Sequence, residues 1–368
     1  MQIMDPIFCY QVPVVIGAGI SGAAIAMLTP NVVVYDKGRS YGGRVSSKQG
    51  TNQATFDFGA TMFRDPMEVR WLGREIKYSI VEIWKSQSVS LQTKPIYSES
   101  HFYPPLGMAN LVSAMLGNVK PIQSHTLKRM ERTDGNTWNL EFHNSATKQT
   151  DTICTHSVIL TLPIPQILEI FQRSTENHYL KLWSEFLENY NDYRKTLVSY
   201  FYWDQWKPDW KALYLDPEAK IPITTNLEPG TDWEYQSWES LKYPREFHSG
   251  SALLVQFGAL FSETHFDNWM DEKKNPNPND KGYLIQSLKE IFNAPEPNLI
   301  WNHRWKYAQA QMPLLGREGP LDLDSEAFEE WKHLCKETGI TVLGDWLFGP
   351  KIERIVGGIY FLSHNDLL

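Results

Sequence analysis

The sequence predicts an α/β fold, with a Rossmann-like domain that begins near the N-terminus and a second domain of mixed β-sheet and helices. The apolar triplet Val14 to Ile16 indicates a buried parallel strand, and it runs into glycines at 17, 19 and 22. Their G-x-G-x-x-G spacing is typical of a strand-to-helix turn that binds a dinucleotide. A second apolar stretch, Asn31 to Tyr35, ends at Asp36. An acid about 20 residues past the first glycine is placed to accept ribose hydroxyl protons.

Each glycine of this turn has a physical reason. Gly17 allows the tight turn, Gly19 leaves room for a pyrophosphate, and Gly22 lets the helix pack closely on the strand. The run Ala23 to Leu28 is compatible with that helix, whose N-terminal N–H groups would face the phosphates. A short glycine pattern alone would also fit an ordinary loop, but the preceding strand, the following helix and Asp36 favour a nucleotide site.

Composition excludes several classes of protein. The chain has 368 residues, long enough for two domains, and a net charge of -8, with no Lys/Arg cluster of the kind that binds nucleic acid. No stretch approaches the ~18 apolar residues of a transmembrane helix, and Met1 to Tyr10 lacks the pattern of a secretory signal. We therefore expect a cytoplasmic protein with neither a membrane nor a nucleic-acid partner.

The cysteine pattern also fits a protein of the reducing cytoplasm. Cys9, Cys154 and Cys335 lie far apart and form no C-x-x-C pair. This spacing argues against a disulfide framework and against a structural zinc site. No metal is expected.

The next elements follow from periodicity. Thr55 to Ala60 indicates a strand that meets a turn, and Met67 to Trp84 has the apolar spacing of a helix. A β-like stretch covers Val89 to Tyr97, and a helix is expected from Ala109 to Leu116. Pro121 to Phe142 is β-rich, with Asp134-Gly135 as its hairpin turn.

The α/β pattern then returns. A buried strand is expected at Ser157 to Pro163, and a helix at Pro165 to Phe171. Residues from 172 to 300 are aromatic and mixed, with alternating stretches such as Ser251 to Phe257. Near the C-terminus a strand ends in Gly344-Asp345, and Ile355 to Leu362 has an ambiguous, partly helical pattern. We assign residues 1–75, 105–171 and 301–368 to a discontinuous cofactor-binding domain, and 76–104 and 172–300 to a substrate domain.

Two segments indicate which dinucleotide cofactor the glycine turn binds. Gly42-Gly43-Arg44-Val45-Ser46-Ser47, followed by Phe56 to Ala60, resembles the signature of the renalase-like branch of the FAD-dependent amine oxidoreductases. The resemblance continues through Pro105 to Met108, Val158 to Pro163, Leu253 to Gln256, Glu263 to His265, His303 to Ala308 and Leu343 to Asp345. The segment His303 to Ala308 is the part most specific to that branch. A plain NAD-binding Rossmann domain would lack this continuation.

The resemblance implies an amine oxidase / p-hydroxybenzoate hydroxylase-like fold and an FAD cofactor. Gly17, Gly19, Ile20, Ser21 and Gly22 would surround the pyrophosphate, and Asp36 and Lys37 would contact the adenosine ribose. Gly43 and Arg44 would lie beside the pyrophosphate and flavin, where a guanidinium offers planar donors and stays charged when buried. Gly59, Ala60 and Thr61 would approach the isoalloxazine ring, and the Leu127 backbone the adenine. Asp345 would accept from a ribityl hydroxyl, next to Gly344.

His303, Trp305 and Tyr307 are the candidate catalytic residues of the segment most specific to the branch. A histidine or tyrosine in a protein is as often packed as catalytic, so packing remains the alternative. The tail departs from the family pattern. It has Val356-Gly357-Gly358-Ile359-Tyr360 where relatives carry Ser-Gly and small residues that open a helix under the flavin. Such a helix N-terminus would stabilise negative charge at the flavin pyrimidine.

The resemblance implies an FAD-dependent oxidase that takes a hydride from isomeric dihydronicotinamide dinucleotides and is reoxidised by molecular oxygen. Because the flavin itself accepts the hydride, a base is optional, and aromatic walls would exclude water. Arg304 and Lys306 are candidates to hold the phosphates of such a donor. A flavin amine oxidase is the first alternative, favoured if an aromatic cage faces the flavin. A non-catalytic flavin-binding protein and an NAD-dependent dehydrogenase are the others.

Overall fold

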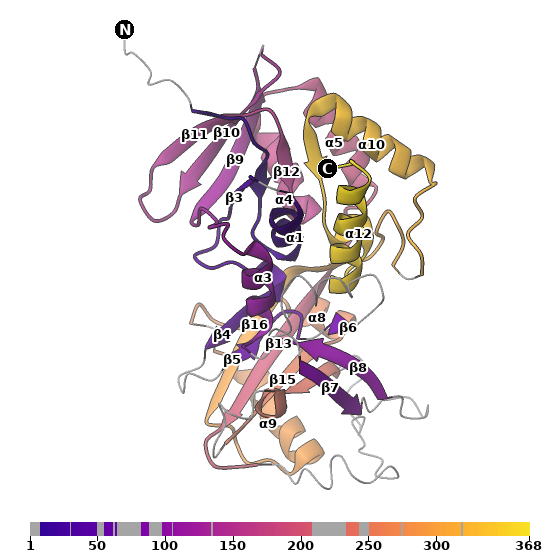
Figure 1. Ribbon diagram of the computed structural model, residues 1–368. Coiled ribbons are helices and arrows are strands. Elements are labelled where there is room, and N and C mark those ends of the chain that lie inside the picture. Colours follow the sequence, from indigo (N-terminus) through magenta and orange to yellow (C-terminus); the bar gives the residue numbers. More distant parts are fainter. Residues whose placement is uncertain are drawn as a thin grey trace.

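A parallel four-stranded sheet forms the centre of the first of two lobes (Figure 1). Its strands are hydrogen-bonded in the order β17 (Ile340–Val342), β12 (Val158–Leu160), β2 (Val14–Ile16) and β3 (Val33–Tyr35). All three residues of β2 are buried, as expected for a strand with both faces covered. The expected strands at 14–16, 31–35 and 157–163 are confirmed. The computed structural model describes residues 8–368 except 30, 50–54, 62, 65–81, 88–97, 105, 134, 208–232, 243–249, 274 and 318.

Helices cover this sheet. The helix after the glycine turn is α1 (Ile20–Leu28), which packs against α12 (Ile352–His364) and α3 (Met108–Leu116). The remaining helices of the lobe are α4 (Ile164–Arg173), α5 (His178–Glu188), α10 (Glu326–Thr338) and the short α11 (Asp345–Phe348). The expected helices at 109–116 and 165–171 are confirmed, and the ambiguous stretch 355–362 lies within α12. Within the described part of the chain, no helix is long and apolar enough to cross a membrane.

A second sheet of the first lobe carries the predicted hairpin. It is ordered β1 (Cys9–Tyr10), β11 (Thr150–Thr155), β10 (Trp138–Asn144) and β9 (His125–Arg132). Strands β9 and β10 are antiparallel. The parallel pairing of β1 with β11 sets Cys9 opposite Cys154, and a disulfide joins the two. Our argument from spacing against a disulfide framework therefore failed for this pair, because strand pairing brings together residues 145 positions apart.

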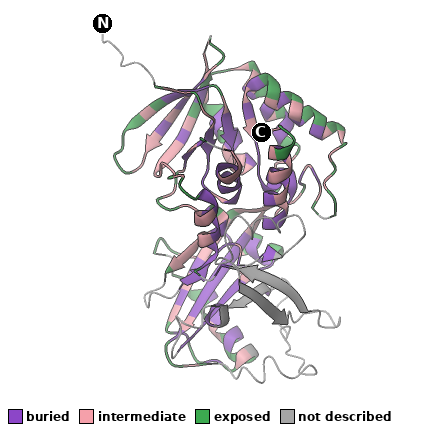
Figure 2. Ribbon diagram, viewed as in Figure 1, coloured by how far each residue is buried: buried purple, intermediate pink, exposed green. Residues whose placement is uncertain are grey.

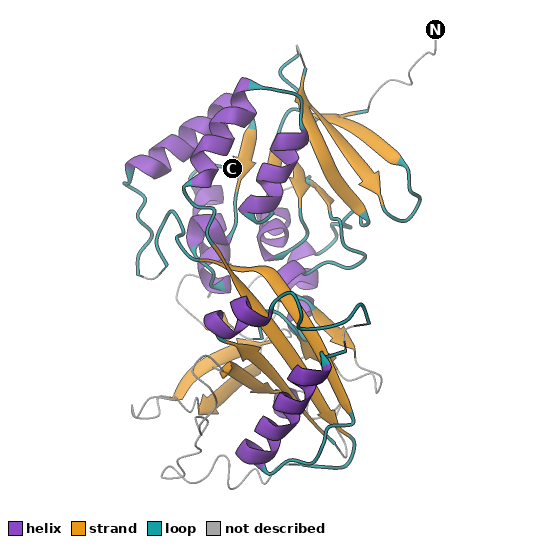
Figure 3. Cartoon of the chain, turned by 180° about the vertical axis from the view of Figure 1, so that it is seen from behind, coloured by secondary structure: helices purple, strands orange, loops and turns teal. Residues whose placement is uncertain are grey.

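The second lobe is built on an antiparallel sheet. Its order is β14 (Trp233–Trp238), β15 (Ser251–Phe257), β13 (Tyr193–Trp203) and β16 (Leu299–Ala310). Helices α8 (Ala259–His265) and α9 (Pro278–Phe292) belong to this lobe, as Figure 3 shows from behind. Smaller elements complete the fold: β4 (Ser47–Gln49), β5 (Thr55–Asp57), β6 (Phe63–Arg64), β7 (Glu82–Gln87), β8 (Ser98–Tyr103), α7 (Glu239–Lys242) and the 3₁₀ turn η1 (Gly43–Val45).

Aromatic side chains join the two lobes. Phe56, the middle residue of β5, stacks on Tyr200 of β13 with ring centroids 4.1 Å apart. Phe58 meets Trp301 and His303 of β16 at 5.4 Å each. Figure 2 shows buried residues running through both lobes. This packing fixes the sheet of the second lobe against the glycine-rich turns of the first.

The structure places two elements across the predicted domain boundaries. Strand β16 (Leu299–Ala310) pairs with β13 in the second lobe, although we assigned residues from 301 onward to the cofactor domain. Helix α5 (His178–Glu188) packs on α4 and α10 of the first lobe. The expected helix at 67–84 is wrong at its described end, because Glu82–Gln87 pairs as a strand; the rest of that helix and the stretch 89–97 lie outside the described residues.

Candidate functional site

The glycine turn lies where β2 meets α1. The Gly17 N–H donates to the Tyr35 carbonyl at 2.8 Å, which ties the turn to the next strand. A Cβ at Gly22 would lie 1.9 Å from the Gly17 carbonyl oxygen, so only glycine allows the helix this close to the strand. A Cβ at Gly19 would meet nothing nearer than 3.9 Å. The space beside Gly19 is therefore open, as a cradle for phosphate requires.

Asp36 is fixed at the end of β3 by the same turn. Its Oδ2 accepts from the Ala18 N–H and its Oδ1 from the Gly38 N–H, each at 2.6 Å. Each carboxylate oxygen accepts more than one hydrogen bond, so capacity remains for a ribose hydroxyl. Lys37 Nζ, beside it, donates to Gln166 Oε1 at 2.8 Å.

A cavity of about 450 Å³ runs along these groups. Its walls come from the glycine turn, the end of β3, the Gly42–Lys48 segment, the residues after β12, and β16. The predicted residues that line it are Gly17, Gly19, Ile20, Ser21, Asp36, Lys37, Gly43, Arg44, Trp305 and Tyr307.

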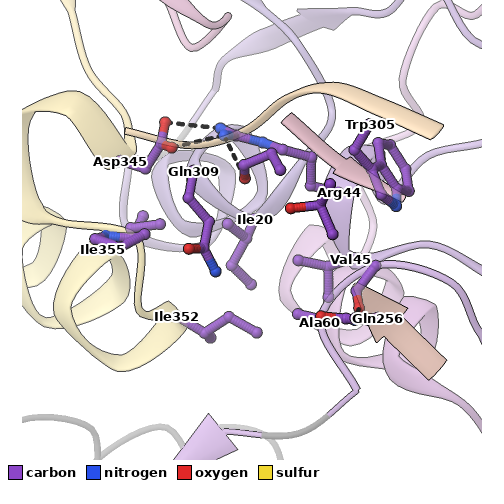
Figure 4. A pocket seen from close by; sticks show the side chains of 14 residues that line it. Ile20, Arg44, Val45, Ala60, Gln256, Trp305, Gln309, Asp345, Ile352 and Ile355 are labelled. Carbon is purple, nitrogen blue, oxygen red and sulfur yellow. Dashed lines mark hydrogen bonds and ion pairs between the residues drawn. The ribbon is translucent and has the colours of Figure 1, made fainter. Parts of the chain in front are cut away.

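A smaller cavity of about 110 Å³ continues from it between the lobes (Figure 4). Ile20, Arg44, Val45 and Trp305 line both cavities, so the two adjoin each other. The predicted residues Gly59, Ala60 and Asp345 line only the smaller one. A Cβ at Gly59 would lie 1.8 Å from the Arg44 carbonyl oxygen. We expected glycine there to clear a ring, but the need also arises from close contact with this neighbouring backbone.

An ion pair closes the smaller cavity on one side. Arg44 Nη1 donates to Asp345 Oδ2 at 2.6 Å and Nη2 to Oδ1 at 2.7 Å, while Nη1 also reaches the Tyr307 and Ala308 carbonyls at 3.2 Å. Burial alone would lower the pKa of Arg44, but the charge of Asp345 and its hydrogen bonds outweigh burial and raise it. Asp345 itself is 2% exposed.

Further donors surround the same carboxylate. Ala310 N donates to Asp345 Oδ2 at 3.0 Å, and the Tyr193 hydroxyl donates to Oδ1 at 3.4 Å. Burial and the negative Asp345 raise the pKa of Tyr193, so its hydroxyl stays a proton donor. Asp345 therefore holds Arg44, where we had expected it chiefly to contact a ribityl hydroxyl.

The candidate catalytic residues of β16 divide into two groups. Trp305 lines both cavities, and its Nε1 donates to the Phe58 carbonyl at 2.9 Å, so the ring is held in place. Tyr307 lines the larger cavity, 6.0 Å from Tyr193 between ring centroids. His303 lines neither cavity and packs between Phe58 and Trp305. Gly22, Thr61, Leu127 and Gly344 also lie outside both linings.

Sequence reasoning missed several residues of the smaller cavity. They are Thr196 of β13, Gln256 of β15, Ala308 and Gln309 of β16, and Pro350, Ile352 and Ile355 near the start of α12. Gln256 Nε2 donates to the Gly59 carbonyl at 2.7 Å. Gln256 and Ala308 lie in segments that carried the resemblance, but no spacing indicated which side chains face the cavity.

A helix does begin beside the cavity, but at a different place in the chain from the one that the family pattern indicates. Helix α12 begins at Ile352, beside the cavity, and the Gly357-Gly358 pair lies inside it. A Cβ at Gly358 would lie 2.2 Å from the Phe348 ring, so this glycine serves packing. The open glycine cradle, the fixed Asp36 carboxylate, the Arg44 guanidinium and this helix N-terminus together fit an FAD molecule lying along the adjoining cavities.

Comparison with known proteins gives this geometry a family context. Residues 15–72 match the family described as NAD(P)-binding Rossmann-like domain, which covers the glycine turn, Asp36 and Arg44. Renalase of Mus musculus is 23% identical over 334 residues, spanning 85% of this chain and 90% of renalase. The chain is therefore similar to renalase over most of its length. The predicted resemblance, the FAD cofactor and the oxidoreductase class are confirmed for this renalase-like chain.

Solved structures agree on the fold of the renalase-like chain. A putative protoporphyrinogen oxidase from Exiguobacterium sp. 255-15 matches with a TM-score of 0.66 and 12% identity, covering 98% of this chain and 99% of the other. A reduced UDP-galactopyranose mutase gives 0.64 and 11%, covering 97% and 96%. Cyclohexylamine oxidase from Brevibacterium oxydans IH-35A gives 0.58 and 11%, covering 98% and 99%. The predicted fold class is confirmed.

Proposed function

We propose that this chain oxidises isomeric dihydronicotinamide dinucleotides by hydride transfer to FAD, with molecular oxygen as the final acceptor. The observation that supports this proposal most directly is the set of residues that line the smaller cavity. Among its described residues, Arg44 and Asp345 are the two with charged side chains, and they are bound to each other. This wall therefore supplies no general base, and a donor that needs none suits it best.

The two leading donor classes differ in that requirement. An alkylamine has a pKa near that of lysine, about 10.4, and must lose a proton before it is oxidised. A dihydronicotinamide releases a hydride directly from carbon and becomes an aromatic pyridinium, so no base is needed. His303, the candidate catalytic residue whose side chain could accept a proton, lies outside the cavity lining.

An aromatic cage would favour the amine reading. Of the described residues that line the smaller cavity, only Trp305 is aromatic; apart from the Arg44–Asp345 ion pair, the others are aliphatic or carry amide and hydroxyl groups. Two other aromatic residues of β16, Trp301 and His303, contact Phe58 at the junction of the lobes. This arrangement supports the dihydronicotinamide reading.

The residues of the chain bind, orient and exclude water. Gly19 and the α1 N-terminus would hold the pyrophosphate of FAD, and Asp36 its ribose. Arg44, held by Asp345, would place a positive charge beside the flavin. When bound, FAD supplies the hydride acceptor and passes two electrons to oxygen, which yields hydrogen peroxide. Trp305 would cover the reacting face and keep water from it.

Arg304 and Lys306 are the two candidates to hold the donor phosphates, and Arg304 already donates hydrogen bonds within the protein. Arg304 Nη1 donates to the Phe266 and Asp267 carbonyls at 3.0 and 3.1 Å, and its guanidinium lies 5.4 Å from the Phe266 ring centroid. Lys306 is exposed and lines the larger cavity. We therefore assign the phosphate contact to Lys306.

An anaerobic titration of the yellow holoprotein tests this function. Isomeric dihydronicotinamide dinucleotides should bleach the flavin absorption band stoichiometrically, and admission of oxygen should restore the band with release of peroxide. A panel of primary and secondary amines should leave it unchanged. Bleaching by amines alone would establish an amine oxidase, the activity named for the structural neighbour cyclohexylamine oxidase. Bleaching by neither class would overturn both readings.

A further inference from the structure

One polar side chain of the smaller cavity stands apart from the rest. Gln309, near the end of β16, is half-buried and lines the cavity. Figure 4 shows its amide directed into the cavity, near Ile20 and Ile352. Its side chain makes no hydrogen bond to any residue that the structure describes. The amide therefore lies within an aliphatic part of the lining.

This placement leaves the amide available to a ligand that fills the cavity and displaces water from it. A primary amide carries two N–H donors and a carbonyl acceptor, and enclosing them against apolar walls without partners is unfavourable. The neighbouring glutamines are used differently. Gln256 Nε2 donates to the Gly59 carbonyl, and Gln311 Nε2 donates to the Gln309 carbonyl while its Oε1 accepts from Arg317. Gln309 is the described glutamine of this lining whose amide remains available.

The surroundings indicate which end of the cofactor meets it. Helix α12 begins at Ile352, next to Gln309, and a helix N-terminus favours electron-rich oxygens. The pyrimidine edge of a flavin presents an N–H between two carbonyl oxygens. A primary amide offers an N–H and a C=O on one edge, so it can pair with the flavin N–H and one adjacent carbonyl together.

We propose that the Gln309 side-chain amide hydrogen-bonds to the pyrimidine edge of FAD and so sets the affinity for the cofactor. This inference concerns the cofactor and does not depend on the identity of the electron donor. A residue on the sheet of the second lobe thus recognises a cofactor that the first lobe anchors. FAD would then contact both lobes, the second of them through β16.

Equilibrium binding to the full-length apoprotein tests the proposal. FAD and 3-methyl-FAD, in which the pyrimidine N–H is blocked, are titrated into the wild type and Gln309→Leu, which keeps the side-chain size. Wild type should bind 3-methyl-FAD about tenfold more weakly than FAD, and Gln309→Leu should lose about tenfold in FAD affinity. In Gln309→Leu the preference for FAD over 3-methyl-FAD should largely disappear. Gln311→Leu is the matched control and should bind like the wild type.

Three outcomes would overturn the proposal. One is unchanged FAD affinity in Gln309→Leu. Another is a preference for FAD over 3-methyl-FAD that persists in full in this variant. The third is normal FAD binding with a raised KM for the donor, which would assign the amide to the donor's carboxamide. Because the titration contains no donor, failure of the proposed reaction would leave its result unaffected.

Discussion

Arg44 and Asp345 are 301 positions apart in the chain and form a two-bond ion pair where the two cavities meet. The pair joins η1 to the start of α11, and Ala310 N and the Tyr193 hydroxyl add hydrogen bonds from the second lobe. A guanidinium held by both nitrogens cannot rotate away from the cavity. The Arg44 charge is therefore held in position at the cavity without a bound cofactor.

Replacement of Asp345 by asparagine tests this preorganisation. Asp345→Asn keeps the shape but leaves the partly buried Arg44 charge without its counterion, so the free energy of unfolding of the apoprotein should fall by about 2 kcal/mol. FAD affinity should fall as well, because Arg44 loses its fixed orientation. Urea unfolding of the apoprotein and FAD titration measure the two effects separately. Tyr193→Phe, which removes only the bond of 3.4 Å, is the control and should change both far less. If apoprotein stability is unchanged in Asp345→Asn, the pair does not form before the cofactor binds.

Two glycines of the same turn should respond in opposite ways to alanine. A Cβ at Gly22 would overlap the Gly17 carbonyl oxygen at 1.9 Å, so Gly22→Ala should cost at least about 3 kcal/mol of apoprotein stability. At Gly19 the nearest atom would be 3.9 Å away, so Gly19→Ala should change stability by less than about 1 kcal/mol. The new methyl group would reach the open space beside the turn and weaken FAD binding. Thermal unfolding and FAD titration of both variants check this. Equal destabilisation would show that Gly19 has a packing role.

The sequence could predict the parts of the site that depend on local spacing. Gly17 and Asp36 lie in segments where a strand, a turn and a helix follow one another, so their positions follow from chain order, whereas Arg44 was assigned through the family resemblance. Residues that face the cavity from the second lobe could not be found this way. Gln256 reaches the cavity through the pairing of β15 with β13, and Gln309 through that of β16 with β13. An alternating pattern does not tell which strands are neighbours.

The disulfide shows the same limit. Cys9 and Cys154 become neighbours through a parallel pairing of the two-residue strand β1 with β11. A strand so short has no periodicity to detect. The pairing of Arg44 with Asp345 was also hidden, since each residue could be assigned to the cofactor separately. Contacts between residues far apart in the sequence depend on the assembled sheets.

Thiol counting tests the cysteine arrangement. Denatured protein should yield one thiol without reductant and three with it, because Cys9 and Cys154 are joined. In the folded protein, burial raises the pKa of Cys335 to about 12, so its reactive thiolate is scarce at pH 8. Alkylation of folded protein should be very slow at pH 8 and rise about tenfold per pH unit up to that pKa. Mass spectrometry after iodoacetamide treatment measures both. Three thiols without reductant would contradict the disulfide.

Replacement of His303 by phenylalanine tests whether this ring serves packing or catalysis. The ring lies outside both cavity linings and packs on Phe58 and Trp305, so His303→Phe, which keeps an aromatic ring, should change the rate of flavin reduction by less than about fivefold. Loss of a general base would instead lower the rate by about 10²–10⁴-fold. With no base in the described lining, the reduction rate should also be nearly constant from pH 6 to pH 9 in wild type and variant alike. Anaerobic stopped-flow measurement of flavin absorbance across that range gives both results. His303 would be the base if the wild-type rate fell as the pH was lowered through an apparent pKa near 6.5, and if the rate of His303→Phe did not.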